Sequence, residues 1–153
     1  MDSDACAVLS IDADVAEIRR ASVWVGKTGL QMGVPPEQIE RLDLCLNEAL
    51  ANVLEHGGQG ARQAPIVLTL GLDRDAESRL ACLTVSDAGH PVNPLLIVPK
   101  NVAHTLEDAT PGGLGIQMIR TFSDRLEYHF SQGRNHLTFA VRWADQEFPA
   151  TLG

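Results

Sequence analysis

The distribution of apolar positions is most regular between residues 36 and 56. There the apolar residues recur at intervals of three and four, which is the spacing of one face of an α-helix. Pro36 suits the first turn of a helix, and Gly57-Gly58 follows its last residue. We therefore predict a helix over 36–56. Its apolar stripe consists of Ile39, Leu42, Leu46, Ala49, Leu50 and Val53.

Two further helices are predicted on weaker patterns. Asp12 or Asp14 can cap a helix whose apolar face includes Val15, Ile18 and Val25. Later in the chain, Gly112-Gly113 opens a helix that runs to about Ser123. The side chains that we expect this helix to bury are Leu114, Met118, Ile119 and Phe122.

Short apolar runs bounded by polar or glycine-rich segments predict the strands. They cover residues 5–11, 66–72, 80–86, 126–131 and 136–143, and the last two form a hairpin across 132–135. The stretch 57–65 is expected to be a turn, and 88–111 a long loop with at most a brief turn around 94–98. The order βααββαββ predicts an α/β two-layer sandwich, with helices on one face of a mixed, mostly antiparallel sheet.

Length and composition fit one ordinary globular domain. The chain has 153 residues, 44% hydrophobic and 21% charged, so we expect a single domain over 1–153 with its core at about 8–143. Three widely spaced cysteines fit reduced thiols. The N-terminal residues do not resemble a signal peptide, and no apolar stretch approaches a membrane span. We expect a cytoplasmic protein with no membrane partner.

The charge balance argues against direct binding of nucleic acid. Twelve lysines and arginines face twenty aspartates and glutamates, which gives a formal net charge of −8. A nucleic-acid-binding surface needs clustered basic residues, and only Lys27 and Lys100 are lysines. An acidic domain can still bind a phosphate-bearing small molecule if backbone amides and a metal ion neutralise the phosphates.

A row of polar residues follows one side of the helix predicted over 36–56. Glu48, Asn52 and His56 are spaced four residues apart, so they project from the same side. A solvated helix face would explain such a row. The alternative is chemical, because a carboxylate can orient or deprotonate a nucleophile and a carboxamide oxygen suits Mg²⁺.

Two glycine-containing segments also invite more than one interpretation. Asp87 and Gly89 end a predicted strand, where they form either a simple turn or a site for the amino group of a nucleobase. The segment 111–115, PGGLG, runs directly into a predicted helix, where free backbone amides favour anions. Glycines also simply end loops, so this segment alone is a weak signal.

Taken together, the three segments resemble the boxes of one superfamily. Residues 48–57, EALANVLEHG, resemble the N-box of the GHKL superfamily of gyrase, heat-shock chaperones, histidine kinases and MutL. Asp87-Ala-Gly89 resembles the G1 box and Gly113-Leu114-Gly115 the G2 box, with a variable ATP lid between them. Size and spacing are most similar to the anti-sigma-factor serine/threonine kinases of bacterial partner-switching systems.

This resemblance implies a role for each matching residue. Asn52 would coordinate Mg²⁺ at the phosphates of ATP, and Glu48 would act as the general base toward a substrate serine. Asp87 would accept a hydrogen bond from the adenine amino group, while Gly89 would make room for the ring. The G2 box would contribute Gly113, Leu114 and Gly115 to the nucleotide site. His56 would lie near the nucleotide with a structural role at the helix end.

The resemblance also implies partners and leaves two functions open. The implied function is an ATP-dependent kinase that binds a sigma factor and phosphorylates a STAS-type anti-sigma-factor antagonist. A homodimer is the assembly that the resemblance implies. The alternative is a degenerate nucleotide-binding module that sequesters a partner without catalysis. It is motivated by His90-Pro91, which replaces the family's usual second glycine, and by Lys100 being the only lysine or arginine from 88 to 111. Arg120 would reach the phosphates only if the geometry of its helix allows, and we expect it to form a surface salt bridge instead.

Overall fold

The computed structural model describes residues 6–96 and 111–144, and of residues 111–115 it gives the helical backbone alone. In chain order the elements are β1 (Cys6–Ile11), α1 (Ala16–Gln31), α2 (Pro36–His56), α3 (Gly58–Arg62), β2 (Ile66–Arg74), β3 (Ser78–Asp87), the 3₁₀ helix η2 (Pro94–Leu96), α4 (Pro111–Phe122), β4 (Arg125–Ser131) and β5 (Arg134–Ala144). The predicted order of strands and long helices is confirmed, and α2 has the predicted bounds.

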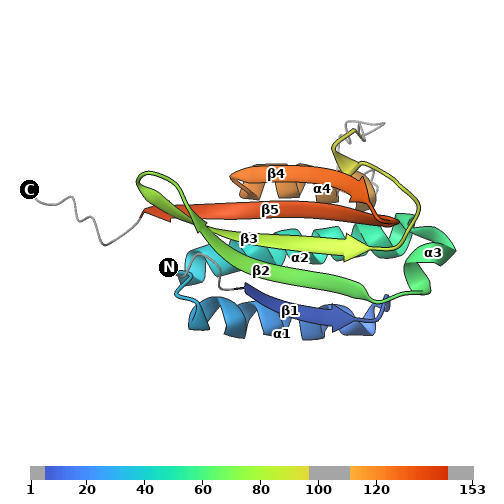
Figure 1. Cartoon of the computed structure of the whole chain (residues 1–153), viewed down its shortest axis with the longest axis horizontal. Helices are drawn as coiled ribbons and strands as arrows, with labels where there is room; N and C mark the ends of the chain where they lie inside the picture. Colours follow the sequence, from blue (N-terminus) through green and yellow to red (C-terminus); the bar gives the residue numbers. More distant parts are fainter. Residues whose placement is uncertain (1–5, 97–110, 145–153) are drawn as a thin grey trace, which may run out of the picture.

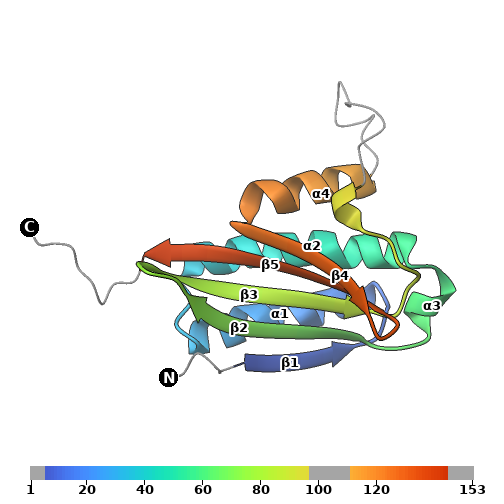
Figure 2. The same ribbon diagram turned by 45° about the horizontal axis from the view of Figure 1, so that its top comes forward.

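The five strands form one sheet in the order β1-β2-β3-β5-β4. Each neighbouring pair among them is antiparallel. The prediction of a mixed sheet was therefore wrong in that respect, since the described strands include no parallel pair. Helices α1, α2 and α4 lie together on one face of the sheet (Figures 1 and 2), as the predicted two-layer sandwich requires.

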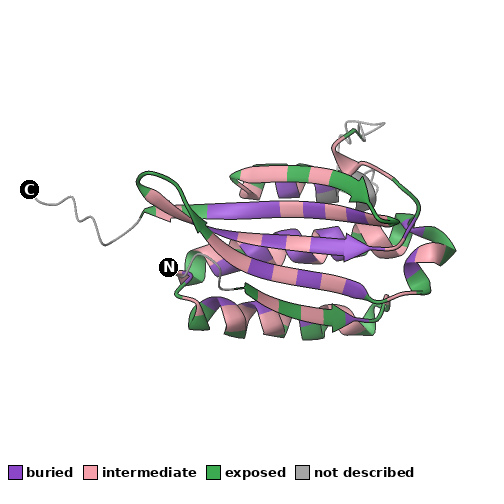
Figure 3. Ribbon diagram, viewed as in Figure 1, coloured by how far each residue is buried: buried purple, intermediate pink, exposed green. Residues whose placement is uncertain are grey.

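The core lies between this helical layer and the facing side of the sheet. Burial alternates along β2 and β5, because successive strand residues point to opposite faces (Figure 3). The apolar stripe of α2 packs there, with Leu42, Leu46 and Leu50 fully or almost fully buried. Val15 was expected on the apolar face of the first helix, but it is 71% exposed and precedes α1.

The structure differs from the prediction in two short segments. In each of them a glycine has a positive φ, which other residues rarely adopt. Gly58 has a φ of +71° and starts the five-residue helix α3, where a turn was predicted. The β4–β5 hairpin turns over two residues, Gln132 and Gly133, whose φ values are +53° and +76°. Positive φ at both positions is typical of the type I′ turn. Residues 134 and 135, predicted in the turn, therefore belong to β5.

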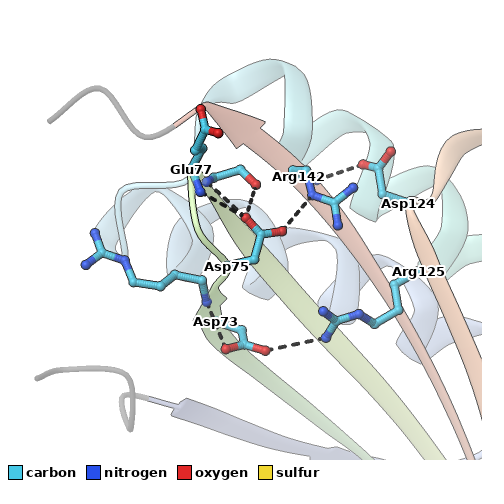
Figure 4. Close-up of polar contacts among 8 residues, drawn as sticks. Asp73, Asp75, Glu77, Asp124, Arg125 and Arg142 are labelled. Carbon is cyan, nitrogen blue, oxygen red and sulfur yellow. Dashed lines mark hydrogen bonds and ion pairs between the residues drawn. The ribbon is translucent and has the colours of Figure 1, made fainter. Parts of the chain in front are cut away.

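At the hairpin end of β2 and β3, charged side chains cross the outer face of the sheet (Figure 4). Arg125 Nη1 lies 3.4 Å from Asp73 Oδ2, and Arg142 Nε lies 3.3 Å from Asp75 Oδ2. Leu80 pairs in register with both Asp73 and Arg142 and has no exposed surface. The long arginine side chains thus bury apolar surface while their charged groups stay paired.

No helix in the described ranges is both long enough and apolar enough to span a membrane. At 21 residues α2 has the length, but acidic and basic side chains are distributed along it. Its polar side is instead available to a site at the end where α2, β3 and β5 converge.

Candidate functional site

A pocket opens where the C-terminal half of α2 faces the end of β3 and the beginning of β5. In Figure 1 this is the end of the sheet nearest α3, opposite the charged cluster of Figure 4. Three of the predicted site residues, Asn52, His56 and Asp87, line it together. The remaining lining residues are Val53, Gly57, Val85, His90, Val92, Pro94, Tyr128, Asn135 and Leu137.

Helix α2 divides its side chains between the core and this pocket. Leu46, Ala49 and Leu50 are buried, whereas Glu48, Asn52 and His56 keep some exposure on the other side. Asn52 and His56 reach the pocket, and Glu48 lies one turn before Asn52, outside the lining residues. No hydrogen bond or ion pair within the described residues engages the Glu48 carboxylate. It is therefore free to contact a ligand or substrate that extends from the pocket along α2.

The side-chain amide of Asn52 has an unsatisfied buried polar atom. Its Nδ2 atom is shielded from solvent and has no hydrogen-bond partner in the described residues. Leaving a buried polar atom unpaired costs about 1–3 kcal/mol, so such atoms are usually paired or belong to a ligand site. Turning the amide by 180° would place the oxygen at this unpaired position instead of the nitrogen. In that orientation the amide fits a phosphate-bound cation such as Mg²⁺, for which a carboxamide oxygen is a suitable ligand.

His56 ends α2 at the edge of the pocket. Its side chain is 47% exposed, and Nε2 lies 3.8 Å from the Glu55 carboxylate. A histidine in the last turn also interacts favourably with the negative end of the helix dipole when it is protonated. His56 thus lies at the pocket, whereas its proximity to a nucleotide and its role there stay predictions.

Asp87 closes the opposite side of the pocket at the end of β3. It is 7% exposed, and its Oδ1 atom accepts hydrogen bonds from the backbone N–H of Gly89 at 2.8 Å and from Asn135 Nδ2 at 3.1 Å. Both hydrogen bonds that Asp87 accepts within the described residues end on this one oxygen. The second carboxylate oxygen is therefore available to accept a hydrogen bond from a ligand amino group.

The backbone near Gly89 packs directly against the end of α2. A Cβ atom at Gly89 would lie 2.7 Å from the carbonyl oxygen of Gly57 and 2.9 Å from Asp87 Oδ1. One at Gly60 would lie 2.9 Å from the carbonyl oxygen of Ala88. Glycine is thus required at these positions by contact between two parts of the chain itself. Room for an adenine ring, the predicted reason for Gly89, stays a prediction.

The predicted G2 box begins helix α4, which packs against α2. Gly113, Leu114 and Gly115 have helical backbone, and their contacts lie outside what the structure describes, as does Lys100. Arg120, farther along α4, donates from Nη2 to the carbonyl oxygen of Leu95 at 2.6 Å. Instead of the expected salt bridge, the described structure shows this hydrogen bond, which ties α4 to η2.

Several pocket residues were not predicted, above all Asn135 and Tyr128. Asn135 was assigned to a turn, where asparagine is common, and Tyr128 to an ordinary strand. Both became pocket residues because the two-residue turn places Asn135 directly opposite Asp87 in the β3–β5 ladder. Strand alternation from the core residue Leu137 would have indicated the correct face for Asn135, had the strand been started two residues earlier.

Comparison with known proteins identifies the family of this chain. Residues 11–141 match the model of the histidine kinase-like ATPase domain family. The chain belongs to this family. The serine/threonine-protein kinase BtrW of Bordetella bronchiseptica, a curated relative, is 37% identical over 105 residues, which cover 69% of this chain and 71% of BtrW. The resemblance inferred from the three motifs is confirmed, and membership of a histidine kinase-like ATPase family implies that the domain binds ATP.

Two solved structures share the fold at low sequence identity. The RsbU and RsbW domains of Rv1364c from Mycobacterium tuberculosis align over 90% of this chain with a TM-score of 0.62 and 14% identity. This chain spans 32% of that protein. In the SiaB–SiaC complex from Pseudomonas aeruginosa, the matched chain aligns over 90% of this one and 89% of its own length, with a TM-score of 0.54 and 12% identity. The predicted histidine kinase-like fold is thereby confirmed.

Proposed function

We propose that the protein is an ATP-dependent serine/threonine kinase that phosphorylates an anti-sigma-factor antagonist and also binds a sigma factor. The observation that carries the proposal is the buried Nδ2 atom of Asn52, one helical turn from the Glu48 carboxylate. Neither group has a hydrogen-bond partner in the part of the chain that the structure describes. Both project from the helix that forms one wall of a pocket containing Asp87. A family relative named a serine/threonine-protein kinase supports the same assignment.

The pocket divides into a base side and a phosphate side. Asp87 would accept a hydrogen bond from the 6-amino group of adenine, because its Oδ1 is held by internal donors and the other oxygen is available. Asn52 would hold Mg²⁺ at the phosphates, and the amides at Gly113 and Gly115 would add donors at the beginning of α4. When bound, Mg²⁺ supplies the positive charge that offsets the phosphate oxygens in phosphoryl transfer.

Glu48 would act as the general base that accepts the proton of the substrate hydroxyl group. The serine oxygen of the antagonist forms a bond to the γ-phosphorus of ATP while the bond between that phosphorus and the bridging oxygen breaks. ADP leaves with the bonding electrons, and Glu48 accepts the proton of the hydroxyl group. A carboxylate without a competing internal partner is suited to this role.

The partners proposed for the kinase follow from the family resemblance and the relatives. The matched structure of SiaB was solved in complex with SiaC, so a relative of the same fold binds a separate protein. For this chain we propose a STAS-type antagonist and a sigma factor as partners, with a homodimer as the assembly. The net charge of −8 supports contact with transcription proteins rather than with nucleic acid.

One observation favours a second function, a nucleotide-binding module that sequesters a partner without catalysis. Pro91 follows His90 where the family's G1 box usually continues to another glycine. Proline fixes its own φ and lacks a donor, so this segment is stiffer than a glycine-containing one. Tight partner binding without phosphoryl transfer would be the signature of this function.

The test incubates the chain with Mg²⁺, γ-labelled ATP and the antagonist encoded beside it. The kinase proposal expects label on an antagonist serine. It also expects Glu48→Gln to lower transfer at least a hundredfold with ATP affinity retained, and Asn52→Ala to lower both. Glu40→Gln, on an exposed position of the same helix and outside this pocket, is the matched control and should leave transfer unchanged. Antagonist binding without any transfer by the unmodified chain would overturn the kinase proposal.

A further inference from the structure

Asn135 has the densest set of side-chain hydrogen bonds at the pocket. It begins the paired part of β5 opposite Asp87 and is 7% exposed. Its Nδ2 atom lies 3.1 Å from each of three acceptors: Asp87 Oδ1, the carbonyl oxygen of Gly89 and that of His90. Its Oδ1 atom accepts from the Tyr128 hydroxyl group and, at 3.3 Å, from the backbone N–H of Val92.

The surroundings determine which way this amide points. On one side all three neighbours are acceptors, which only the NH₂ group can satisfy. On the other side are two donors, which only the oxygen can accept. Burial raises the pKa of the Tyr128 hydroxyl group above its usual range, and the Asp87 charge raises it further. Tyr128 therefore stays protonated and keeps donating at neutral pH, so the amide has a single stable orientation.

We propose that Asn135, fixed by Tyr128, is a positioning residue that sets the base selectivity of the nucleotide site. It holds Asp87 Oδ1 and the backbone from Gly89 to Val92 in place before a nucleotide arrives. This inference rests on the proposed ATP site but concerns residues outside the three motifs that indicated it.

Base selectivity follows from the different roles of the two oxygens of the Asp87 carboxylate. The Gly89 amide and Asn135 both bind Oδ1, and together they fix the rotation of the carboxylate group. The other oxygen is then pre-oriented toward a ligand donor. A base with an amino group at position 6 supplies that donor. A base with a carbonyl group there places an acceptor against the carboxylate, which leaves a buried polar pair unsatisfied and is strongly disfavoured.

The experiment compares ATP with inosine triphosphate, which differs at position 6 by carrying oxygen in place of the amino group. Affinities for both are measured by calorimetry on the full chain, unmodified and with Asn135→Asp. The substitution keeps the shape of the side chain but replaces the NH₂ donor by a second acceptor facing Asp87. We expect ATP affinity to fall at least tenfold and the preference for ATP over inosine triphosphate to decrease toward one.

Asn47→Asp is the matched control. Asn47 on α2 also donates from Nδ2 to an aspartate, Asp43 Oδ1 at 3.1 Å, and it lies outside the pocket lining. The same chemical change there should leave the ATP preference as it is. At saturating ATP, phosphoryl transfer by Asn135→Asp should stay within about twofold of the unmodified rate while KM for ATP rises, because only base positioning is altered.

Each outcome decides the inference. A folded Asn135→Asp variant with an unchanged ratio of the two affinities overturns it, as does an unmodified chain that does not distinguish the two nucleotides. If Asn135→Asp does not fold, Tyr128→Phe removes only the hydroxyl donor, and an unchanged ratio in that variant also overturns it. A chain that prefers ATP but transfers no phosphoryl group contradicts the proposed kinase and leaves this inference to be decided by the same binding ratios.

Discussion

Gly89 lies so close to Gly57 that a Cβ atom at position 89 would stand 2.7 Å from the Gly57 carbonyl oxygen. Gly57 is the residue at which α2 ends, and Gly89 follows the last residue of β3 by two. The contact therefore joins the helix that carries Glu48 and Asn52 to the strand end that carries Asp87. The distance between Asn52 on one side of the pocket and Asp87 on the other is therefore set by backbone packing.

Replacing Gly89 by alanine should disturb both sides of the pocket. The added methyl group meets backbone and the Asp87 carboxylate, which cannot move away as a flexible side chain would. We expect ATP affinity to fall at least tenfold and the melting temperature to decrease, measured by calorimetry and thermal unfolding. Gly26→Ala is the control, because a Cβ there meets nothing within 4 Å inside α1. It should leave binding unchanged and stabilise the helix by about 0.5–1 kcal/mol.

The two sides of α2 should respond differently to truncation. Leu46 has no exposed surface, so Leu46→Ala should lower the free energy of unfolding by about 2–5 kcal/mol. Glu48→Ala, two residues later on the polar side, should change it by no more than about 0.5 kcal/mol. Urea titrations measure both. Similar losses in the two variants would contradict the assignment of Glu48 to function rather than packing.

The Cys45 thiol should make the folded state sensitive to alkaline pH. Burial raises its pKa to about 12, whereas an unfolded thiol titrates near 8.5. The folded state thus favours the protonated form, and the free energy of unfolding should fall as pH rises from about 9 toward 12. Urea titrations at pH 8 and pH 10.5 measure this fall. It should be smaller in Cys45→Ala, and an equal fall in both chains would show that Cys45 does not contribute.

Asp75, in the charged cluster of Figure 4, should make the stability of the folded state depend on pH in the acid range. The Ser78 hydroxyl group donates to it at 2.5 Å, and this bond, with backbone donors and Arg142, lowers the carboxyl pKa. A lowered pKa contributes stability above the unfolded value of about 3.9, and that contribution is lost as pH falls through the folded value. Asp75→Asn should lower the urea midpoint at pH 7, and the difference from the unmodified chain should shrink as pH falls below about 3.9. A midpoint difference that stays constant between pH 7 and about pH 2.5 would contradict this account.

The long-range order of elements could be predicted because each rests on local patterns. The apolar stripe of α2, with Pro36 and Gly57 at its ends, predicted the bounds of that helix, and short apolar runs predicted the five strands. Glu48, Asn52 and Asp87 could be singled out because their motifs are short and local. The contact between Gly57 and Gly89 could not be predicted, because no local pattern indicates that two glycines 32 residues apart lie in contact.

The role of Asn135 could not be predicted from the sequence. Its role depends on strand register, which was fixed by a turn shorter than the one predicted. A one-residue slip in register would send its side chain to the opposite face of the sheet. A single sequence contains no local pattern that distinguishes an asparagine in a turn from one that faces an aspartate across a ladder.

The position of β5 has a consequence for when the site can exist. β5 is the last strand along the described chain, yet it lies between β3 and β4 in the sheet. The wall that holds Asp87 in place is therefore absent until this strand has been inserted. A ligand that binds only the completed pocket stabilises that insertion by mass action. The nucleotide would thus bind and stabilise chains in which β5 is already inserted, and it would not bind chains in which β5 has yet to join the sheet.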